Sequence, residues 1–574
     1  IDLIDLEDKG TFDLLKKGLT TAVFQLESRG IKEYIVKLKP SNFEDIIALV
    51  ALYRPGPLEM KMVDTYINRK KGVEQTKYGD DHVEKILKNT YGVIVYQEQV
   101  MQLAQEFSGF SLGQADLLRR AMGKKIPEEM EKQRPVFIEG AVKKGKSSRF
   151  AEGLFDQIET FAGYGFNKSH SAAYAMISYQ TAWLKSHYPA QFMAAALSSE
   201  MGDSDKIQLL LDDAKVLGLK ILPPDINLST KDFVTLDNES ILFSLGAIKG
   251  VGDPAIENII QERSKKPFEN LNEFVSRVDL KKVDKRSLEP LIKSGALDSF
   301  NEDRFEMINK LEGALKFARQ KTELKESNID DLFGEISNSI EMKQTKLSSK
   351  FQEFGKSKLE LDSLGFYLTA HPMDESGWEV KKIAPENISS LTASKQIQRC
   401  AGVVISYKKI NTRRGPLIFA TLDDNSDRLE LIISGEVLEK FAQQLDNEKI
   451  LIVDGEISED KSKEKENLGL AKKMNVSSIL TMEQARIKFA RKLTICIDSK
   501  DTSFLDKNIK ELKSFSSSEM QDGCPVEIKY SSKEADAEME VGDNFKILLS
   551  DDNFKKLVKN YGEKNLDINY FNRQ

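Results

Sequence analysis

Hydrophobic residues recur at helical spacing along the first 225 residues of the chain. One well-marked group, with apolar positions mostly three and four residues apart, comprises Phe43, Ile46, Ile47, Leu49 and Val50. Glycine and proline interrupt the periodicity at residues 55–57 and 163–165, and Pro223-Pro224 closes the region. This pattern predicts a mostly α-helical domain over residues 1–225.

The pattern changes after this helical region. A short run of Val, Ile and Leu leads into the glycine-rich segment 246–252, and a helical stretch follows from Pro254 to Arg263. The next part of the chain is charged, rich in Lys, Glu and Ser and poor in aromatic residues, which predicts a mixture of helix and linker. We therefore expect a hairpin-containing region at residues 226–300 and a helical or linker region at residues 301–385.

Short apolar runs from residue 398 to residue 480 predict β-strands. The strand candidates are residues 401–407, 417–422, 429–433 and 450–453, with a helical stretch near residues 436–444. This order is typical of a small β-barrel. We predict a barrel over residues 386–485 and a separate small α/β unit over residues 486–574, so the predicted fold is multidomain, helical first and β-rich later.

Length and composition agree with several domains. The chain has 574 residues, and length alone predicts about three to five domains. No apolar run reaches the roughly 20 residues that span a bilayer, and Cys400, Cys496 and Cys524 match neither a disulfide framework nor a metal knuckle. These features favour a cytoplasmic protein. The chain opens on Ile1 rather than Met and reads as a sequence already under way, so we expect a fragment.

One segment is basic although the net charge is −7. Between Ala115 and Lys146, nine Lys or Arg residues stand against five Asp or Glu residues. Nucleic-acid binding depends on local charge rather than on total charge, so this segment is a candidate phosphate-binding surface. A solvated helical face would have the same composition. The sequence leaves both interpretations open.

The segment GYGFNKSHS, residues 163–171, carries the pattern that points most directly to chemistry. Its glycines permit a tight turn, and the helix that follows would offer unpaired N–H groups and a positive dipole end to an anion. Lys168 and the hydroxyl groups of Ser169 and Ser171 lie at that helix start, so triphosphate binding is a natural interpretation. The competing interpretation is a glycine-rich loop whose serines cap the helix.

Two further basic elements could contact phosphates. Arg120 and Lys124 are four residues apart on a predicted helix, so they share a face and could clamp neighbouring phosphates. A helix surface that ends at a glycine would show the same pattern. The turn at residues 53–57 presents the single guanidinium of Arg54, which is a weak signal by itself.

The segment IKGVG, residues 248–252, resembles a helix-hairpin-helix DNA binder. Its small residues would let main-chain N–H groups approach a DNA phosphate without reading the base sequence. The candidate backbone contacts are therefore Lys249, Gly250 and Gly252. An ordinary glycine-rich turn is the alternative.

The predicted barrel resembles an OB-fold, which usually binds single strands in a basic, aromatic-lined groove. Its first hairpin supplies positive charge and nearby rings for stacking, through Lys408, Lys409, Arg413, Arg414, Tyr407 and Phe419. A purely structural barrel is the alternative.

No residues form a convincing metal site. The four histidines have no metal-ligand spacing with the cysteines. Asp423 and Asp424 lie near a presumed strand-end turn, where we expect solvent exposure. We find no acidic pair suited to hold two magnesium ions.

Several segments, in order, resemble the alpha subunit of bacterial DNA polymerase III, a family C replicative polymerase. The resemblance runs over nearly the whole chain and is densest between Thr20 and Asn227. Its hallmarks are TAVFQLESRG at residues 21–30, ALYRPGPL at 51–58, YQEQVM at 96–101, RRAMGKK at 119–125, GYGFNKSHSAA at 163–173 and ILPPDIN at 221–227. A set of long matches in order is far more specific than one glycine-rich loop.

The resemblance implies DNA-templated transfer of a nucleotide from a dNTP to a primer 3′-hydroxyl, in a palm of the polymerase-beta-like class. In that family, palm aspartates hold two Mg²⁺ ions. Residues 1–225 would form the fingers, with the edge of the palm at the start. The matching segments imply electrostatic contacts to the nucleotide or the template from Arg54, Arg119, Arg120, Lys124, Lys125, Asn167, Lys168, Ser169 and His170.

The order of domains in the family implies further partners. Residues 226–300 would bind primer–template DNA, and the barrel would bind single-stranded template. A peptide within residues 301–385 would bind the sliding clamp, and residues 486–574 would bind the tau subunit of the clamp loader. The clamp peptide would comprise Ile329, Asp331, Leu332 and Phe333, with Ile329 standing where the family usually carries Gln.

The resemblance also identifies what this sequence does not contain. The palm aspartates and the N-terminal polymerase-and-histidinol-phosphatase domain lie upstream in the family, so we expect no catalytic or metal-binding residue here and no polymerase activity from this fragment alone. A proofreading exonuclease subunit would bind through the missing part. Two alternatives stay open: a translesion-type paralogue, and a non-enzymatic DNA-binding protein that combines hairpin and OB modules.

Overall fold

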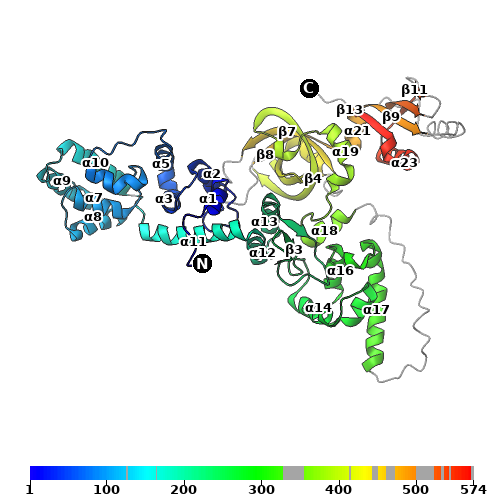
Figure 1. Cartoon of the computed structure of the whole chain (residues 1–574). Helices are drawn as coiled ribbons and strands as arrows, with labels where there is room; N and C mark the ends of the chain where they lie inside the picture. Colours follow the sequence, from blue (N-terminus) through cyan, green and yellow to red (C-terminus); the bar gives the residue numbers. More distant parts are fainter. Residues whose placement is uncertain are drawn as a thin grey trace. The chain divides into compact units, whose positions relative to one another are not determined.

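The chain folds into two compact units, Ile1–Gln344 and Thr345–Gln574. The computed structural model describes residues 1–124, 127–162, 164–326, 355–412, 415–442, 450–459, 472–498, 523–531, 536–541 and 545–570. The predicted fold class is confirmed, because helices come first, and a β-barrel and a small α/β unit follow (Figure 1).

Helices build the N-terminal part of the first unit. They are α1 (Lys9–Lys16), α2 (Arg29–Leu38), α3 (Phe43–Leu52), α4 (Pro55–Glu59), α5 (Met62–Lys70), α6 (Asp81–Leu87), η1 (Lys88–Thr90), α7 (Gln97–Glu106), α8 (Leu112–Lys124), α9 (Pro127–Lys143), α10 (Ser148–Ala162), α11 (Lys168–His187), α12 (Pro189–Ser199) and α13 (Ser204–Val216). Side chains set several helix starts, since Asp8, Ser28 and Asn42 accept hydrogen bonds from first-turn N–H groups of α1, α2 and α3.

Two hydrophobic cores hold these helices together. The first core is formed by buried side chains of α1, α2, α3, α5 and α11, and the second by those of α6 to α10. Each large apolar side chain that is fully buried contributes roughly 1.5–3 kcal/mol. Because α11 packs against α1 and α3, the first turn of α11 comes to lie beside the first turn of α3. This packing positions the candidate site.

The hairpin region completes the first unit. A three-stranded sheet has the order β1-β3-β2, in which β1 (Lys220–Leu222) is parallel to β3 (Ser240–Leu242) and β2 (Val234–Thr235) is antiparallel to it. The helical part that follows comprises α14 (Asp253–Lys265), α15 (Leu271–Arg277), α16 (Lys285–Lys293), η2 (Asp298–Phe300) and α17 (Arg304–Glu326).

The second unit contains a closed barrel with the strand order β4-β5-β6-β8-β7. Its elements are α18 (Lys356–Leu364), α19 (Pro372–Ile383), η4 (Ile388–Ser390), β4 (Ser394–Thr412), β5 (Gly415–Asp423), β6 (Arg428–Ile433), α20 (Gly435–Ala442), β7 (Leu451–Glu459) and β8 (Lys472–Thr481). The four predicted strands correspond to β4, β5, β6 and β7. The sequence pattern did not predict β8, which pairs with β6 and β7 and closes the barrel.

A small α/β unit follows the barrel. Its elements are α21 (Met482–Phe489), β9 (Ala490–Asp498), β10 (Cys524–Ser531), β11 (Asp536–Glu540), β12 (Lys546–Ile547), α23 (Asp551–Tyr561), η7 (Glu563–Asn565) and β13 (Leu566–Tyr570). The central strands β9 and β10 are parallel, and β13 lies antiparallel to β9. The buried Arg486 of α21 pairs with Glu379 of α19 and with Asp551 of α23, and so ties the barrel to this unit.

Candidate functional site

The glycine-containing turn between α10 and α11 is fixed by the start of α7. The backbone N–H of Gln97 donates to the carbonyl of Phe166 at 2.9 Å, and its side-chain amide donates to the carbonyl of Gly165 at 3.1 Å. Tyr96 and Phe166 also form an isolated parallel β-bridge. The turn is therefore held in one conformation by residues almost 70 positions away.

Side chains accept hydrogen bonds from backbone N–H groups in the first turn of α11. Asn167 caps the helix, because its Oδ1 accepts a hydrogen bond from the N–H of His170 at 2.9 Å. The carboxylate of Glu98 accepts from the N–H of Lys168 at 3.0 Å and from Nδ2 of Asn167 at 2.9 Å. The cap is therefore an asparagine rather than a serine, and a carboxylate already occupies the position at the helix start that an anion would take.

Lys168 and His170 reach solvent from this turn. The Lys168 ammonium lies 3.0 Å from a carboxylate oxygen of Glu44 and 5.3 Å from the centroid of the Tyr96 ring. The exposed His170 ring stacks on Tyr174 with centroids 4.4 Å apart. Ser169 is exposed, whereas Ser171 is buried. Lys168, Ser169 and His170 therefore remain accessible to a phosphate group.

Arg54 also holds the turn in place. Its Nε donates to the carbonyl of Ala51 at 2.7 Å, and its Nη2 donates to the carbonyl of Tyr164 at 2.8 Å. The guanidinium lies 4.2 Å from the centroid of the Phe166 ring, and burial lowers the pKa of Arg54. Because these contacts use two of its nitrogens, Arg54 has a clear positioning role in addition to any contact with a nucleotide.

Arg119 and Arg120 both pair with Asp116 on α8. Nη2 of Arg119 lies 2.8 Å from Oδ1, and Nε of Arg120 lies 2.8 Å from Oδ2. The hydrogen bond from Arg119 is the main cause that lowers the pKa of Asp116. Helix α8 extends to Lys124, so Arg120 and Lys124 lie on one helix at the predicted spacing. Lys125 lies outside the described residues.

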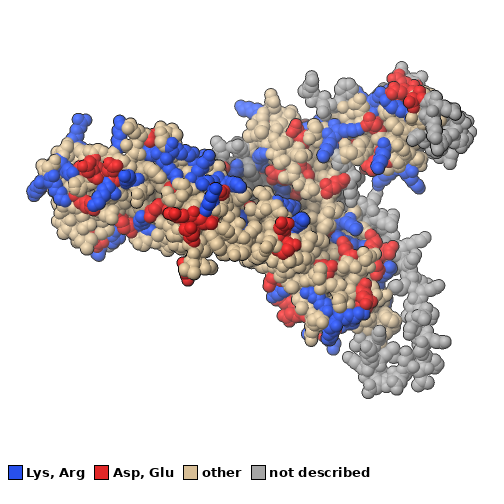
Figure 2. All heavy atoms as spheres, viewed as in Figure 1, with Lys and Arg blue, Asp and Glu red and all other residues tan. Residues whose placement is uncertain are grey.

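Two cations of the basic run from Ala115 to Lys146 pair with acids from outside it. Lys146 pairs with Asp80, and Arg134 pairs with Asp156 and Glu159 of α10. Lys144 instead donates to backbone carbonyls at the end of α7. Figure 2 shows Lys and Arg intermixed with Asp and Glu over the surface in view. The charge surplus counted along the sequence is therefore smaller in the folded protein.

The predicted DNA-binding hairpin lies exposed before α14. Lys249 and Gly250 are exposed, and Gly250 has a φ of +89°, which a residue with a side chain rarely adopts. Gly252 is the N-cap of α14, so no side chain caps the start of this helix. The hairpin thus presents backbone and one lysine to solvent, as phosphate contact requires.

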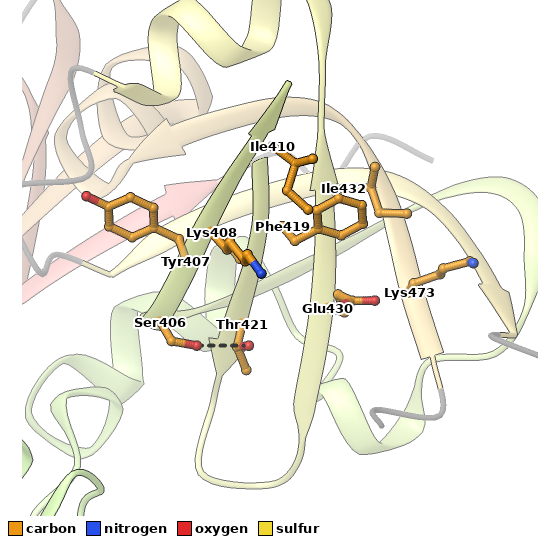
Figure 3. Close-up of a pocket in the computed structure, with 10 residues that line it drawn as sticks. Ser406, Tyr407, Lys408, Ile410, Phe419, Thr421, Glu430, Ile432 and Lys473 are labelled. Atoms are coloured by element: carbon orange, nitrogen blue, oxygen red, sulfur yellow. Dashed lines mark hydrogen bonds between the residues drawn. The ribbon is translucent and has the colours of Figure 1, made fainter. Parts of the chain in front are cut away.

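The barrel carries a groove with a cavity volume of about 710 Å³. It is lined by Ser406, Tyr407, Lys408, Ile410, Phe419, Ala420, Thr421, Glu430, Ile432 and Lys473. In Figure 3, Phe419 lies next to Ile410 and Ile432, whereas Tyr407 points away from them. Sequence reasoning identified Tyr407, Lys408 and Phe419, but it missed Lys473, because this residue lies on the unpredicted strand β8. Lys409 is exposed on β4 but does not line the groove.

Three family models match the chain in the same order as these structural parts. The bacterial DNA polymerase III alpha subunit finger domain matches residues 1–145, a helix-hairpin-helix motif matches residues 218–307, and an OB-fold nucleic acid binding domain matches residues 399–479. The N-terminal helices, the hairpin region and the barrel therefore each have a counterpart among known families.

Similarity to whole proteins extends along 99% of the chain. The DNA polymerase III subunit alpha of Vibrio cholerae serotype O1 is 43% identical, that of Escherichia coli K12 is 41% identical, and that of Haemophilus influenzae is 40% identical. The chain belongs to the DNA polymerase III alpha-subunit family. It spans about half the length of these curated relatives, 49–50% of each.

Several candidate residues from the sequence lie outside the described residues. These are Ile329, Asp331, Leu332 and Phe333 of the clamp peptide, and Arg413 and Arg414 of the barrel hairpin.

The expectation that Asp423 is exposed was wrong. Asp423 is 4% exposed, and its side chain accepts a hydrogen bond from the N–H of Asn425 and pairs with Arg428 at 3.0 Å. The side chain of Asp424 accepts hydrogen bonds from the N–H groups of Ile388 and Ser426. Both carboxylates therefore hold the end of the barrel together rather than forming an open metal site.

In the described part of the chain, no three His, Cys, Asp or Glu side chains gather in a way that could hold a metal ion. Nor does any described helix combine the length and the apolar character needed to cross a bilayer.

Proposed function

We propose that this chain supplies the nucleotide-contacting, DNA-binding and clamp-attachment parts of a replicative DNA polymerase, which transfers a nucleotide from a dNTP to a primer 3′-hydroxyl. The observation that carries the proposal is the similarity to alpha subunits along 99% of the chain. A non-enzymatic protein built from hairpin and barrel modules would leave the finger match at residues 1–145 unexplained, and no observation favours a translesion-type paralogue.

In this proposal the turn before α11 contacts the triphosphate. Lys168, Ser169 and His170 are accessible at one helix start, and Arg119 and Arg120 present further positive charge on α8. Preorganised cations of this kind stabilise the charge that develops on a transferring phosphoryl group and align it for attack. Arg54 and Asn167 would act by holding the turn in place.

The family's Mg²⁺ ions need carboxylate ligands, and the described residues offer no suitable group. The part that we propose for this chain in the reaction is electrostatic contact and alignment.

The proposed domain limits are 1–225, 226–300, 301–385, 386–485 and 486–574. The hairpin at 248–252 would bind primer–template DNA through main-chain N–H groups of the hairpin, and the barrel groove would bind single-stranded template. Both modes of binding depend on phosphate charge and stacking rather than on reading bases. Binding of primer–template by this chain should therefore fall steeply with salt and hardly vary with base sequence; sequence-selective binding would count against the proposal.

We expect Lys249→Ala to weaken duplex binding equally for all sequences. Loss of one phosphate contact should reduce the slope of log affinity against log salt by about 1. Fluorescence anisotropy at several salt concentrations measures this slope. Lys265→Ala is the matched control, because Lys265 is exposed at the other end of α14 and pairs with Glu262. Equal slopes for wild type and Lys249→Ala would remove Lys249 from the DNA interface.

The remaining partners follow from the family resemblance. We propose that the peptide containing Leu332 and Phe333 binds the sliding clamp, that residues 486–574 bind the tau subunit, and that a proofreading exonuclease subunit joins the complete polymerase elsewhere. Replacing both Leu332 and Phe333 by alanine should weaken clamp binding about 100-fold or more, because buried apolar anchors dominate such interfaces.

Titration of the clamp with the wild-type chain and with the double variant measures this loss. Synthesis by the complete subunit without the clamp should stay unchanged, and this serves as the control. Equal clamp affinity for the two proteins would reject the assignment of the peptide.

A further inference from the structure

The ammonium group of Lys168 has a carboxylate partner on a different helix. Glu44 lies in the first turn of α3, and its two carboxylate oxygens lie 3.0 Å and 3.2 Å from Nζ of Lys168. The two residues are 124 positions apart in the sequence, and they meet because α11 packs against α3. The cation proposed to contact phosphate is therefore paired with an anion of the same chain.

The two glutamates at the start of α11 are held in different ways. The carboxylate of Glu98 accepts backbone and side-chain hydrogen bonds from Lys168 and Asn167, which anchor it to the helix. Glu44 meets Lys168 only through the ammonium group, and the two side chains are 44% and 38% exposed. An ion pair this exposed is weak, because water screens the charges and solvates both partners well. Glu44 is thus the carboxylate that can be displaced.

Because of the groups that surround Lys168, Glu44 and a phosphate would compete for its ammonium group rather than share it. Tyr96 lies beneath the ammonium group and is 1% exposed. Burial and, secondarily, the charges of Glu44 and Glu98 raise the pKa of Tyr96, so its phenol stays neutral. Asp45, beside Glu44, is already paired with Lys70. A phosphate that approached Lys168 would therefore meet uncompensated negative charge unless Glu44 moved away.

We propose that Glu44 competes with the nucleotide's phosphate for Lys168, and so lowers the affinity of the fingers for an incoming triphosphate. This inference rests on the proposed function of the site. Glu44 acts as a counter-ion that is released when phosphate binds, whereas Glu98 stays in place and holds the turn. The competition would keep a flexible lysine in a defined position between nucleotides and weaken binding of phosphate compounds that cannot displace the carboxylate.

The test follows the chemical protection of Lys168 in the 574-residue chain. The chain is titrated with magnesium tripolyphosphate, treated briefly with an acetylating reagent at each concentration, and digested for mass spectrometry of the Lys168 peptide. In wild type, tripolyphosphate should protect Lys168. In Glu44→Gln, the midpoint of protection should fall about two- to fivefold, which corresponds to the loss of one exposed ion pair.

Glu33→Gln is the matched control. Glu33 forms an exposed pair with Arg29 on α2 at 3.4 Å, and its substitution should leave the midpoint unchanged. A merely structural role of Glu44 would loosen the site and raise the midpoint, so the direction of the shift separates the two explanations. An unchanged or raised midpoint in Glu44→Gln overturns the inference but leaves the proposed function standing. If tripolyphosphate fails to protect Lys168 in every variant, both are overturned.

Discussion

Replacing Lys168 by glutamate in an alpha subunit that contains this chain should slow single-nucleotide incorporation about 100-fold or more. The substitution removes the accessible cation at the start of α11 and places a second carboxylate beside Glu44. Both changes repel the triphosphate and leave the developing phosphoryl charge without its partner. Rapid-quench measurement of one incorporation step on a saturating primer–template gives the rate directly.

Lys168→Arg is the control for this experiment, because it keeps the charge at the same position. Lys168 is 38% exposed, so neither substitution should change thermal unfolding by much. Incorporation by Lys168→Glu at the wild-type rate would remove Lys168 from the nucleotide site. A loss of activity accompanied by unfolding would be recognised from the melting curve.

Replacing Gly56 by alanine should raise the KM for the incoming dNTP about tenfold or more, because small displacements of positioning groups are costly in a reaction that depends on alignment. A Cβ atom at Gly56 would overlap the ring atoms Cδ1 and Cε1 of Tyr164. The carbonyl of Tyr164 is held by Arg54, so a shift of the ring would disturb the turn that carries Lys168. The overpacking should also destabilise the fingers by about 1–3 kcal/mol.

The double variant Gly56→Ala/Tyr164→Ala separates the clash from other effects. Removal of the ring gives the new methyl group space, so the double variant should be no worse than Tyr164→Ala alone. Steady-state kinetics and thermal unfolding of the three variants measure both effects. If Gly56→Ala retained the wild-type KM, the turn would not depend on this close approach.

The sequence pattern predicted the turn and the helix that follows it, but it did not predict what occupies the helix start. Glycines and a polar run before an apolar periodicity are local signals, and α11 begins at Lys168, as such signals indicate. The partners Glu98 and Glu44 are 70 and 124 positions away from Lys168. Only the packing of α3, α7 and α11 brings them together, and no local pattern contains that information.

Ion pairs, too, could be predicted only between residues that are close in the sequence. Pairing of Arg119 and Arg120 with Asp116 could have been predicted, because the residues are three and four apart on one helix. The pairing of Lys146 with Asp80 could not, because it joins segments 66 positions apart. In the barrel, apolar runs in the sequence predicted strands β4, β5, β6 and β7. Strand β8 begins with two lysines and has few apolar residues at its start, so its Lys473 was missed.

We propose above all that the turn before α11 holds the phosphates of the incoming nucleotide. The most direct test is a structure of an alpha subunit containing this chain, bound to primer–template and a dNTP. Nζ of Lys168 should lie about 2.7–2.9 Å from a phosphate oxygen and should have left Glu44. A bound nucleotide whose triphosphate lies elsewhere, with Lys168 still paired to Glu44, would contradict the claim.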